Sequence, residues 1–240
     1  MQPIAHIETC FPSKFGIPRQ AGIVDTPGRI IFEPPYRVRE AVRGIEGFDY
    51  IWLIWQFSKS IPSSTKSTKQ SPTPWSPTVR PPRLGGNERM GVFATRSPFR
   101  PNPLGLSSVR LLRVEQDEKL GPVLYVSGAD LMDGTPIYDI KPYLPYTDSH
   151  PNARSGFATR PAERLMEVVC PPILLERLPS KLRQPLLDVL AHDPRPQYQH
   201  DPDRVYGMAF NHYNILFRAD DDTQITVVDI TSECVNEGTR

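Results

Sequence analysis

Proline is the residue that most restricts how this chain can fold, because it occupies 28 of the 240 positions. Each proline fixes its own φ angle and removes a backbone hydrogen-bond donor, so a proline inside a helix kinks or breaks it. We therefore expect few long helices and many loops and turns. The length is sufficient for one large domain, or for one domain with a small appendage.

Short apolar segments between the turns carry the pattern of β-strands. They are rich in β-branched and aromatic residues and cover 3–9, 49–58, 89–94, 104–116 and 121–131. The segment DYIWLIWQFS, 49–58, is an almost unbroken apolar run, which predicts a strand buried on both faces. Close turns, few helices and no alternation of strands with helices favour a mainly β fold built on a small antiparallel barrel.

Two segments have helical spacing. Val38, Ala41, Val42 and Ile45 recur at helical intervals and predict a short helix after Pro35. A second amphipathic pattern covers 182–190, although Pro185 lies inside it. The stretch 205–230 that follows predicts a hairpin with its turn at ADDDT.

These patterns divide the chain into two parts. We expect a β-barrel domain over 1–155 and a small α+β domain, a helix with a hairpin, over 160–240. The segment 59–82 is rich in serine, threonine, proline and lysine, which predicts a mobile insertion within the first domain.

Several classes of protein lack support in this sequence. There is no run of 18 apolar residues and no basic N-terminal segment followed by an apolar one, so we expect a cytoplasmic protein. The three cysteines form no CxxC pair and the five histidines have no ligand spacing, so no metal site is expected. GxGxxG, GxxxxGK[ST] and GxSxG motifs do not occur.

Positive charge is concentrated between Ser76 and Arg113, where seven arginines stand against a single glutamate. Arginine presents a planar fork of donors that matches carboxylates and phosphates. Prolines at 98, 101 and 103 preset the backbone there, which reduces the entropy lost when a ligand binds. The pattern indicates an anion site, or else a solvated arginine-rich loop whose prolines protect a strand edge.

A second polar motif is DGTPIYDIKPYLPYTD, 133–148. Asp133 and Gly134 are typical of a tight turn, since the aspartate can accept from backbone N–H groups and glycine permits positive φ. Carboxylates and tyrosines follow this turn closely. Such a group could bind ribose hydroxyls and a positively charged sulfonium or amine.

Long motifs in the first part of the chain closely resemble the TrmO family of tRNA methyltransferases. They are GIPRQAG, EAVRGIEGF, RPPRLGGNERMGVFATRSPFRPNPLGLS and DGTPIYDIKPYLPY, within roughly residues 3–150. In addition, DPRPQY at 193–198 is similar to the family's small C-terminal domain. The resemblance implies an S-adenosylmethionine-dependent enzyme on a β-barrel that acts as a homodimer. It further implies methylation of the exocyclic nitrogen of threonylcarbamoyladenosine beside the anticodon of a threonine tRNA.

The resemblance also implies site residues. The expected cofactor contacts are Pro18, Arg19, Gln20, Ser58, Lys59, Arg96, Leu106, Asp133, Gly134, Thr135 and Pro136. The residues expected to contact RNA are Arg80, Arg83, Arg89, Arg100 and Lys141, with Arg100 open to either ligand. Either Asp133 or Asp139 is the carboxylate expected to act as base or to orient the nitrogen.

Two other functions stay open at this point. One is an RNA-binding barrel without catalysis, in which the arginines only hold phosphates. The other is an enzyme of the same fold that methylates a small adenosine-like metabolite.

Overall fold

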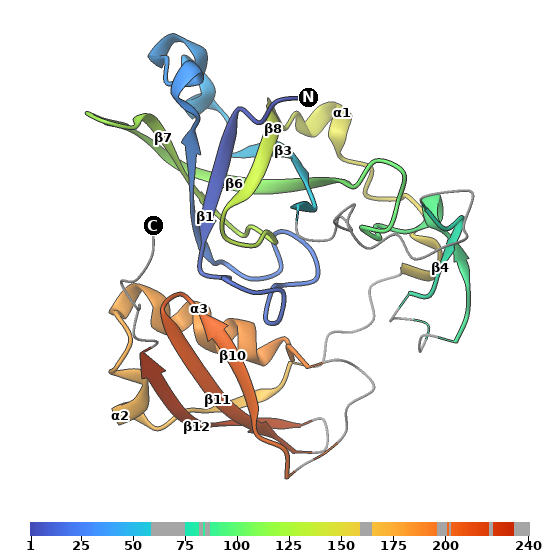
Figure 1. Cartoon of the computed structure of the whole chain (residues 1–240), viewed down its shortest axis with the longest axis vertical. Coiled ribbons are helices and arrows are strands. Elements are labelled where there is room, and N and C mark those ends of the chain that lie inside the picture. The colour runs from blue at the N-terminus through green and yellow to red at the C-terminus, as the bar shows by residue number, and fades with distance from the viewer. Residues whose placement is uncertain are drawn as a thin grey trace, which may run out of the picture.

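The computed structural model describes residues 1–58, 75–81, 84, 87–158, 165–195, 201, 203–220 and 223–232. It contains a closed six-stranded barrel and a separate four-stranded sheet (Figure 1). The barrel strands are β1 (Ala5–Thr9), β2 (Pro27–Phe32), β3 (Tyr50–Gln56), β6 (Leu104–Asp117), β7 (Gly121–Ser127) and β8 (Thr135–Pro142). Their order around the barrel is β1-β2-β7-β6-β3-β8, and every neighbouring pair is antiparallel. The expected mainly β fold with a small antiparallel barrel is confirmed.

The sequence predicts that the strand at 49–58 is buried on both faces, and this prediction is wrong for β3. Ile51, Leu53 and Trp55 are buried in the barrel core, whereas the residues between them are partly exposed. Side chains of a strand alternate between its two faces, and the burial of β3 alternates in the same way. The apolar run therefore reflects one buried face and one partly exposed face.

The helix predicted after Pro35 is wrong. The chain forms three short 3-10 turns instead, at Pro34–Tyr36, Arg39–Val42 and Ile45–Gly47. Val38 has an extended backbone and Gly44 has a φ of 86°, so an α-helix cannot continue through either position. The apolar spacing is used only to place Val42 and Ile45 against the barrel core.

Two barrel strands were not predicted, namely β2 and β8, although β8 contains the motif that follows Asp133. The strand expected at 89–94 is shorter than predicted. Only Met90–Gly91 (β5) is extended, and it pairs with Thr78–Val79 (β4) outside the barrel, while Val92–Ala94 forms a 3-10 turn. The insertion expected at 59–82 lies mostly outside the described residues.

The C-terminal sheet has the order β10-β11-β12-β9, with α3 packed on it (Figure 1). Its strands are β9 (Glu167–Val169), β10 (Tyr206–Phe210), β11 (Tyr213–Ala219) and β12 (Gln224–Ser232), and its helices are α2 (Pro172–Leu175) and α3 (Ser180–Ala191). The short helix α1 (Pro145–Asp148) follows β8, and Asp148 accepts a hydrogen bond from Trp52 on β3. The helix predicted over 182–190 is confirmed with Pro185 inside it. The hairpin predicted over 205–230 is present as β11 and β12, but its first strand is divided, since β10 folds back on β11. Within the described residues, no helix combines the length and apolar character needed to cross a membrane.

The loop between β1 and β2 packs into the core of the C-terminal sheet, and it lies between the two sheets in Figure 1. The ring of Phe11 meets Phe210 edge-on at 6.1 Å, and Phe15 stacks on Phe217 at 6.4 Å. The Asn211 N–H donates a 2.7 Å hydrogen bond to the Cys10 carbonyl. The second core therefore takes part of its residues from before 155, and the division of domains at 155–160 stays a prediction.

Candidate functional site

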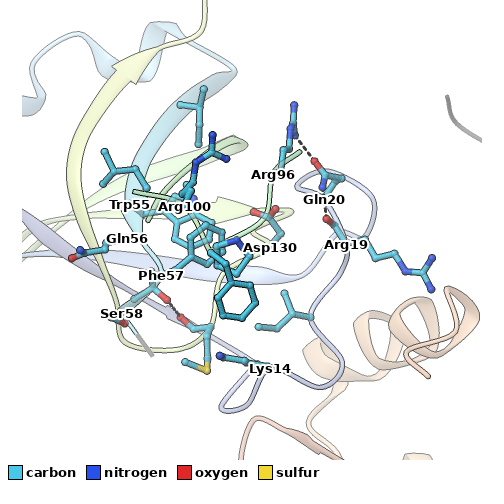
Figure 2. A pocket seen from close by; sticks show the side chains of 18 of the residues that line it. Lys14, Arg19, Gln20, Trp55, Gln56, Phe57, Ser58, Arg96, Arg100 and Asp130 are labelled. Carbon is cyan, nitrogen blue, oxygen red and sulfur yellow. Dashed lines mark hydrogen bonds between the residues drawn. The ribbon is translucent and has the colours of Figure 1, made fainter. Parts of the chain in front are cut away.

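A cavity of about 790 Å³ lies beside the barrel, and parts of the chain far apart in sequence line it (Figure 2). These parts are the β1–β2 loop, the end of β3, the loop before β6, the start of β6 and the segment after β7. Of the cofactor contacts expected from the sequence, Pro18, Arg19, Gln20, Ser58, Arg96, Leu106 and Thr135 line it. Arg100, which was open to either ligand, lines it as well.

Three other expected cofactor contacts lie at the turn before β8 and do not line this cavity: Asp133, Gly134 and Pro136. Asp133 Oδ1 accepts a 2.9 Å hydrogen bond from the Thr9 N–H, and Gly134 has a φ of 73°. This is the tight turn that the sequence predicts, and it places Thr135 at the cavity. Lys59 lies outside the described residues.

Asp139 and Lys141, expected as a base and as an RNA contact, pair with each other on β8. Asp139 Oδ2 lies 3.2 Å from Lys141 Nζ, and both side chains are partly exposed to solvent. Neither residue lines the cavity. The structure therefore does not bring Asp139 together with the other expected site residues.

The two loops at the mouth of the cavity are joined by a hydrogen bond from Arg96 Nη1 to Gln20 Oε1. Arg100 Nη1 donates to the Thr95 carbonyl at 3.1 Å within its own loop. Arg96 and Arg100 therefore line the cavity from a single loop, whose backbone is stiffened by Pro98 and Pro103.

A chain of hydrogen bonds that the sequence did not predict leads into the cavity. Trp55 Nε1 donates to Ser107 Oγ at 2.9 Å, and Ser107 Oγ donates to Asp130 Oδ1 at 2.5 Å. Trp55 and Asp130 line the cavity, and Ser107 is buried behind them. Burial raises the pKa of the Asp130 carboxyl, although the Ser107 hydrogen bond, the Ala21 backbone and the nearby Arg96 act in the opposite direction.

The sequence held a weak signal for Asp130. It is an acidic residue at the end of the apolar segment 121–131, three positions before the Asp133 turn. A lone carboxylate at such a place also fits an ordinary strand end. Its partner Ser107 lies 23 positions away, and only the pairing of the strands brings the two together.

A second cavity of about 1160 Å³ adjoins the first and shares Arg19, Gln20, Arg96, Pro98 and Phe99 with it. Arg80 and Arg89 line it, as do the aromatic residues Phe93, Phe99 and Phe157. Among the described residues that line it, none is acidic. Of the arginines expected to contact RNA, Arg80 and Arg89 thus lie together here, and Arg83 is outside the described residues.

Cationic walls together with exposed aromatic rings suit a ligand that carries both phosphates and bases. Phe93 is 72% exposed and Phe99 is 63% exposed. The indole of Trp75 lies 5.9 Å from the Phe93 ring. In the part of the chain that the structure describes, no three histidine, cysteine, aspartate or glutamate residues are grouped as metal ligands.

Comparison with known proteins agrees with this arrangement. Residues 6–149 match the family model of the tRNA-methyltransferase O N-terminal domain, and residues 170–233 match that of the TrmO C-terminal domain. The tRNA (adenine(37)-N6)-methyltransferase of Escherichia coli strain K12 is 39% identical over 229 residues, covering 92% of this chain and 93% of that protein. A putative S-adenosylmethionine-dependent methyltransferase of Pseudomonas aeruginosa, RcsF, is 38% identical over 224 residues and covers 87% of each chain.

The fold is also similar to a solved structure. The crystal structure of TrmO from Pseudomonas aeruginosa superposes with a TM-score of 0.72 at 32% sequence identity, covering 96% of this chain and 97% of that one. The two family models together account for most of the chain, and they match the barrel and the C-terminal sheet separately. This chain belongs to the TrmO family of tRNA methyltransferases.

Proposed function

We propose that this chain uses S-adenosylmethionine to methylate the exocyclic nitrogen of adenosine 37 in tRNA, and that its substrate is threonylcarbamoyladenosine beside the anticodon of threonine tRNA. The observation that carries the proposal is the convergence of Pro18–Gln20, Ser58, Arg96, Leu106 and Thr135 on one cavity. These residues come from separate segments of the chain, and all but Ser58 lie within the motifs that resemble the family. The relatives named for adenosine 37 methylation support the same reaction.

The residues of the first cavity fit S-adenosylmethionine. Ligand pockets usually measure roughly 300–1,000 Å³, and this cavity lies in that range. Its apolar walls, including Ile17, Phe57 and Leu104, suit an adenine ring, and Arg96 or Arg100 suits the carboxylate of the amino acid. When bound there, the cofactor would supply a methyl group activated by a sulfonium centre.

The second cavity is our candidate for the anticodon loop. Sequence-specific RNA recognition targets unstacked bases, which stack on aromatic rings or on arginine. Phe93 and Phe99 offer such rings, while Arg80 and Arg89 can neutralise phosphates. Because Arg96 and Phe99 line both cavities, an anticodon loop bound in the second cavity would lie next to the first.

We also propose, from the family resemblance, that the chain acts as a cytoplasmic homodimer with Gly134 and Pro136 helping to hold the cofactor. The turn they form is positioned by backbone bonds, since the Gly134 N–H donates to Ile7 and the Asp133 N–H donates to Phe11. Sedimentation of the purified chain measures the oligomeric state directly, and a monomer at working concentrations would contradict this part.

Titration calorimetry with S-adenosylmethionine separates the enzyme from an RNA-binding barrel without catalysis. We expect saturable binding, and its absence at millimolar cofactor would overturn the proposal. Mass spectrometry of anticodon-loop nucleosides from cells that lack this chain separates tRNA from a small metabolite. We expect the methyl group to be lost from the threonylcarbamoyladenosine of threonine tRNA, whereas unchanged methylation would favour a small adenosine-like substrate.

A further inference from the structure

Methylation of an exocyclic nitrogen releases a proton, and a side chain of the cavity that accepts it would accelerate the reaction. The charged side chains that line the first cavity are Lys14, Arg19, Arg96, Arg100 and Asp130. Four of these are cations. Among the lining residues that the structure describes, Asp130 is thus the one carboxylate.

The two aspartates favoured by the sequence are engaged elsewhere. Asp133 accepts the Thr9 N–H at the turn, and Asp139 pairs with Lys141 on β8. Neither lines the first cavity. In Figure 2 the labelled side chain of Asp130 lies in the cavity wall near Gln20 and Arg96.

The hydrogen bonds around Ser107 determine which oxygen of Asp130 can take a proton. Trp55 Nε1 is only a donor, so Ser107 Oγ accepts from it and has its own hydrogen left to donate. That hydrogen points to Asp130 Oδ1 at 2.5 Å. Oδ1 is therefore engaged as an acceptor, and we expect the incoming proton to go to Oδ2.

We propose that Asp130 is the general base of this chain, which rests on the proposed function. As the nitrogen forms its bond to the methyl carbon, the bond from that carbon to sulfur breaks and its electron pair stays on sulfur. The proton of the nitrogen moves to Asp130 Oδ2. Ser107 and Trp55 are positioning residues, because Ser107 Oγ holds the carboxylate through Oδ1 and Trp55 Nε1 orients the Ser107 hydroxyl.

The environment of Asp130 suits this role. Burial raises the pKa of its carboxyl, and a higher pKa makes the carboxylate a stronger proton acceptor. The Asp130 carboxylate accepts a hydrogen bond from the backbone of Ala21, in the loop between β1 and β2 that contains Pro18, Arg19 and Gln20, and it lies near Arg96. The same carboxylate is therefore close to residues expected to bind the cofactor.

The test is single-turnover methylation of threonine tRNA by Asp130→Asn. Asparagine keeps an oxygen that can accept from Ser107 but cannot take a proton. We expect the rate to fall by roughly 100-fold or more, the range of general base catalysis, while the Kd for S-adenosylmethionine stays near that of the unmodified chain. Asp25→Asn is the matched control, because Asp25 also accepts from a barrel serine, Ser127, at 3.1 Å and lines neither cavity.

A second variant keeps the base but changes its pKa. The Ser107 hydrogen bond lowers the pKa of Asp130, so Ser107→Ala should raise that pKa. In a plot of the methylation rate against pH, the rise of the rate should then occur at higher pH, with a plateau that can still be measured. Full turnover by Asp130→Asn with an unchanged pH profile would overturn the proposal. A loss explained entirely by weaker cofactor binding would overturn it too, and would assign Asp130 to the cofactor.

The proposed function fails in a different way from this inference. If the unmodified chain binds no S-adenosylmethionine and yields no methylated tRNA, the proposed function is wrong. The unmodified chain could instead be active, with the rise of the rate with pH abolished by Asp133→Asn or Asp139→Asn and kept in Asp130→Asn. In that case only the assignment of the base is wrong.

Discussion

Arg96 and Gln20, which are 76 positions apart in the chain, meet through a hydrogen bond from the guanidinium of Arg96 to the side-chain carbonyl of Gln20. The bond joins the proline-stiffened loop before β6 to the loop after β1. Both residues line both cavities. This contact thus stands at the place where the proposed cofactor and RNA sites meet.

Replacing Arg96 with alanine should weaken cofactor binding and leave the fold intact. The side chain is exposed and lies at the cavity mouth, so its loss creates no cavity in the core. Hydrogen bonds to charged groups contribute about 1.5–3 kcal/mol, which corresponds to a rise of roughly tenfold or more in the Kd for S-adenosylmethionine. Calorimetry measures the Kd, and a large fall in Tm would instead indicate a structural role.

Alanine at Gly105 should disturb the wall of the first cavity through Trp55. A Cβ atom at this position would lie 2.2 Å from Cε2 of the buried indole, which therefore has to move. Overpacking of this kind costs about 1–3 kcal/mol in the free energy of unfolding. Gly91→Ala is the control, because its Cβ would meet no atom within 4 Å, and thermal melts of both variants make the comparison. Equal Tm values would contradict the close packing of Gly105 on Trp55.

Phe93→Ala should weaken binding of the anticodon stem-loop without lowering the Tm. Its ring is 72% exposed in the second cavity, and stacking of one base on an aromatic ring contributes about 1–3 kcal/mol. Ile173 on α2 is also 72% exposed, which makes Ile173→Ala a control of equal exposure outside both cavities. Fluorescence anisotropy at one salt concentration gives both Kd values. Equal affinity for the two variants would place the RNA elsewhere.

The raised pKa of Asp130 also predicts how stability depends on pH. A carboxyl with a higher pKa in the folded state binds protons more tightly there, so its contribution to the free energy of unfolding falls as pH rises through that pKa. Asp130→Asn removes this dependence. The Tm of the unmodified chain should therefore fall relative to that of the variant as the pH rises above about 4, the ordinary pKa of an aspartyl carboxyl. A difference in Tm that is constant with pH would contradict burial as the dominant cause.

The apolar strands and the turn at Asp133 could be predicted because their signals are local. Alternation and β-branched residues mark β6 and β7, and Gly134 adopts the positive φ that the turn requires. The helix predicted at 38–45 failed for an equally local reason. Its spacing is helical, but Val38 is extended and Gly44 takes a left-handed conformation, so the backbone is interrupted at both positions.

The site itself could be predicted only where long motifs contain it. Arg96 and Pro18 were found in this way, and the cavity contains both. Asp130 could not be predicted, because its role depends on Ser107 and Trp55, which closure of the barrel brings beside it. The motif favours Asp139, yet the pleat of β8 pairs Asp139 with Lys141.

The most direct measurement is methyl transfer by the purified chain from S-adenosylmethionine to threonine tRNA, read by mass spectrometry of nucleosides. Two forms of the tRNA are compared, one with threonylcarbamoyladenosine at position 37 and one with unmodified adenosine. We expect one added methyl group on threonylcarbamoyladenosine and far less on unmodified adenosine. If neither tRNA gains a methyl group while the cofactor binds, then the proposed substrate is wrong.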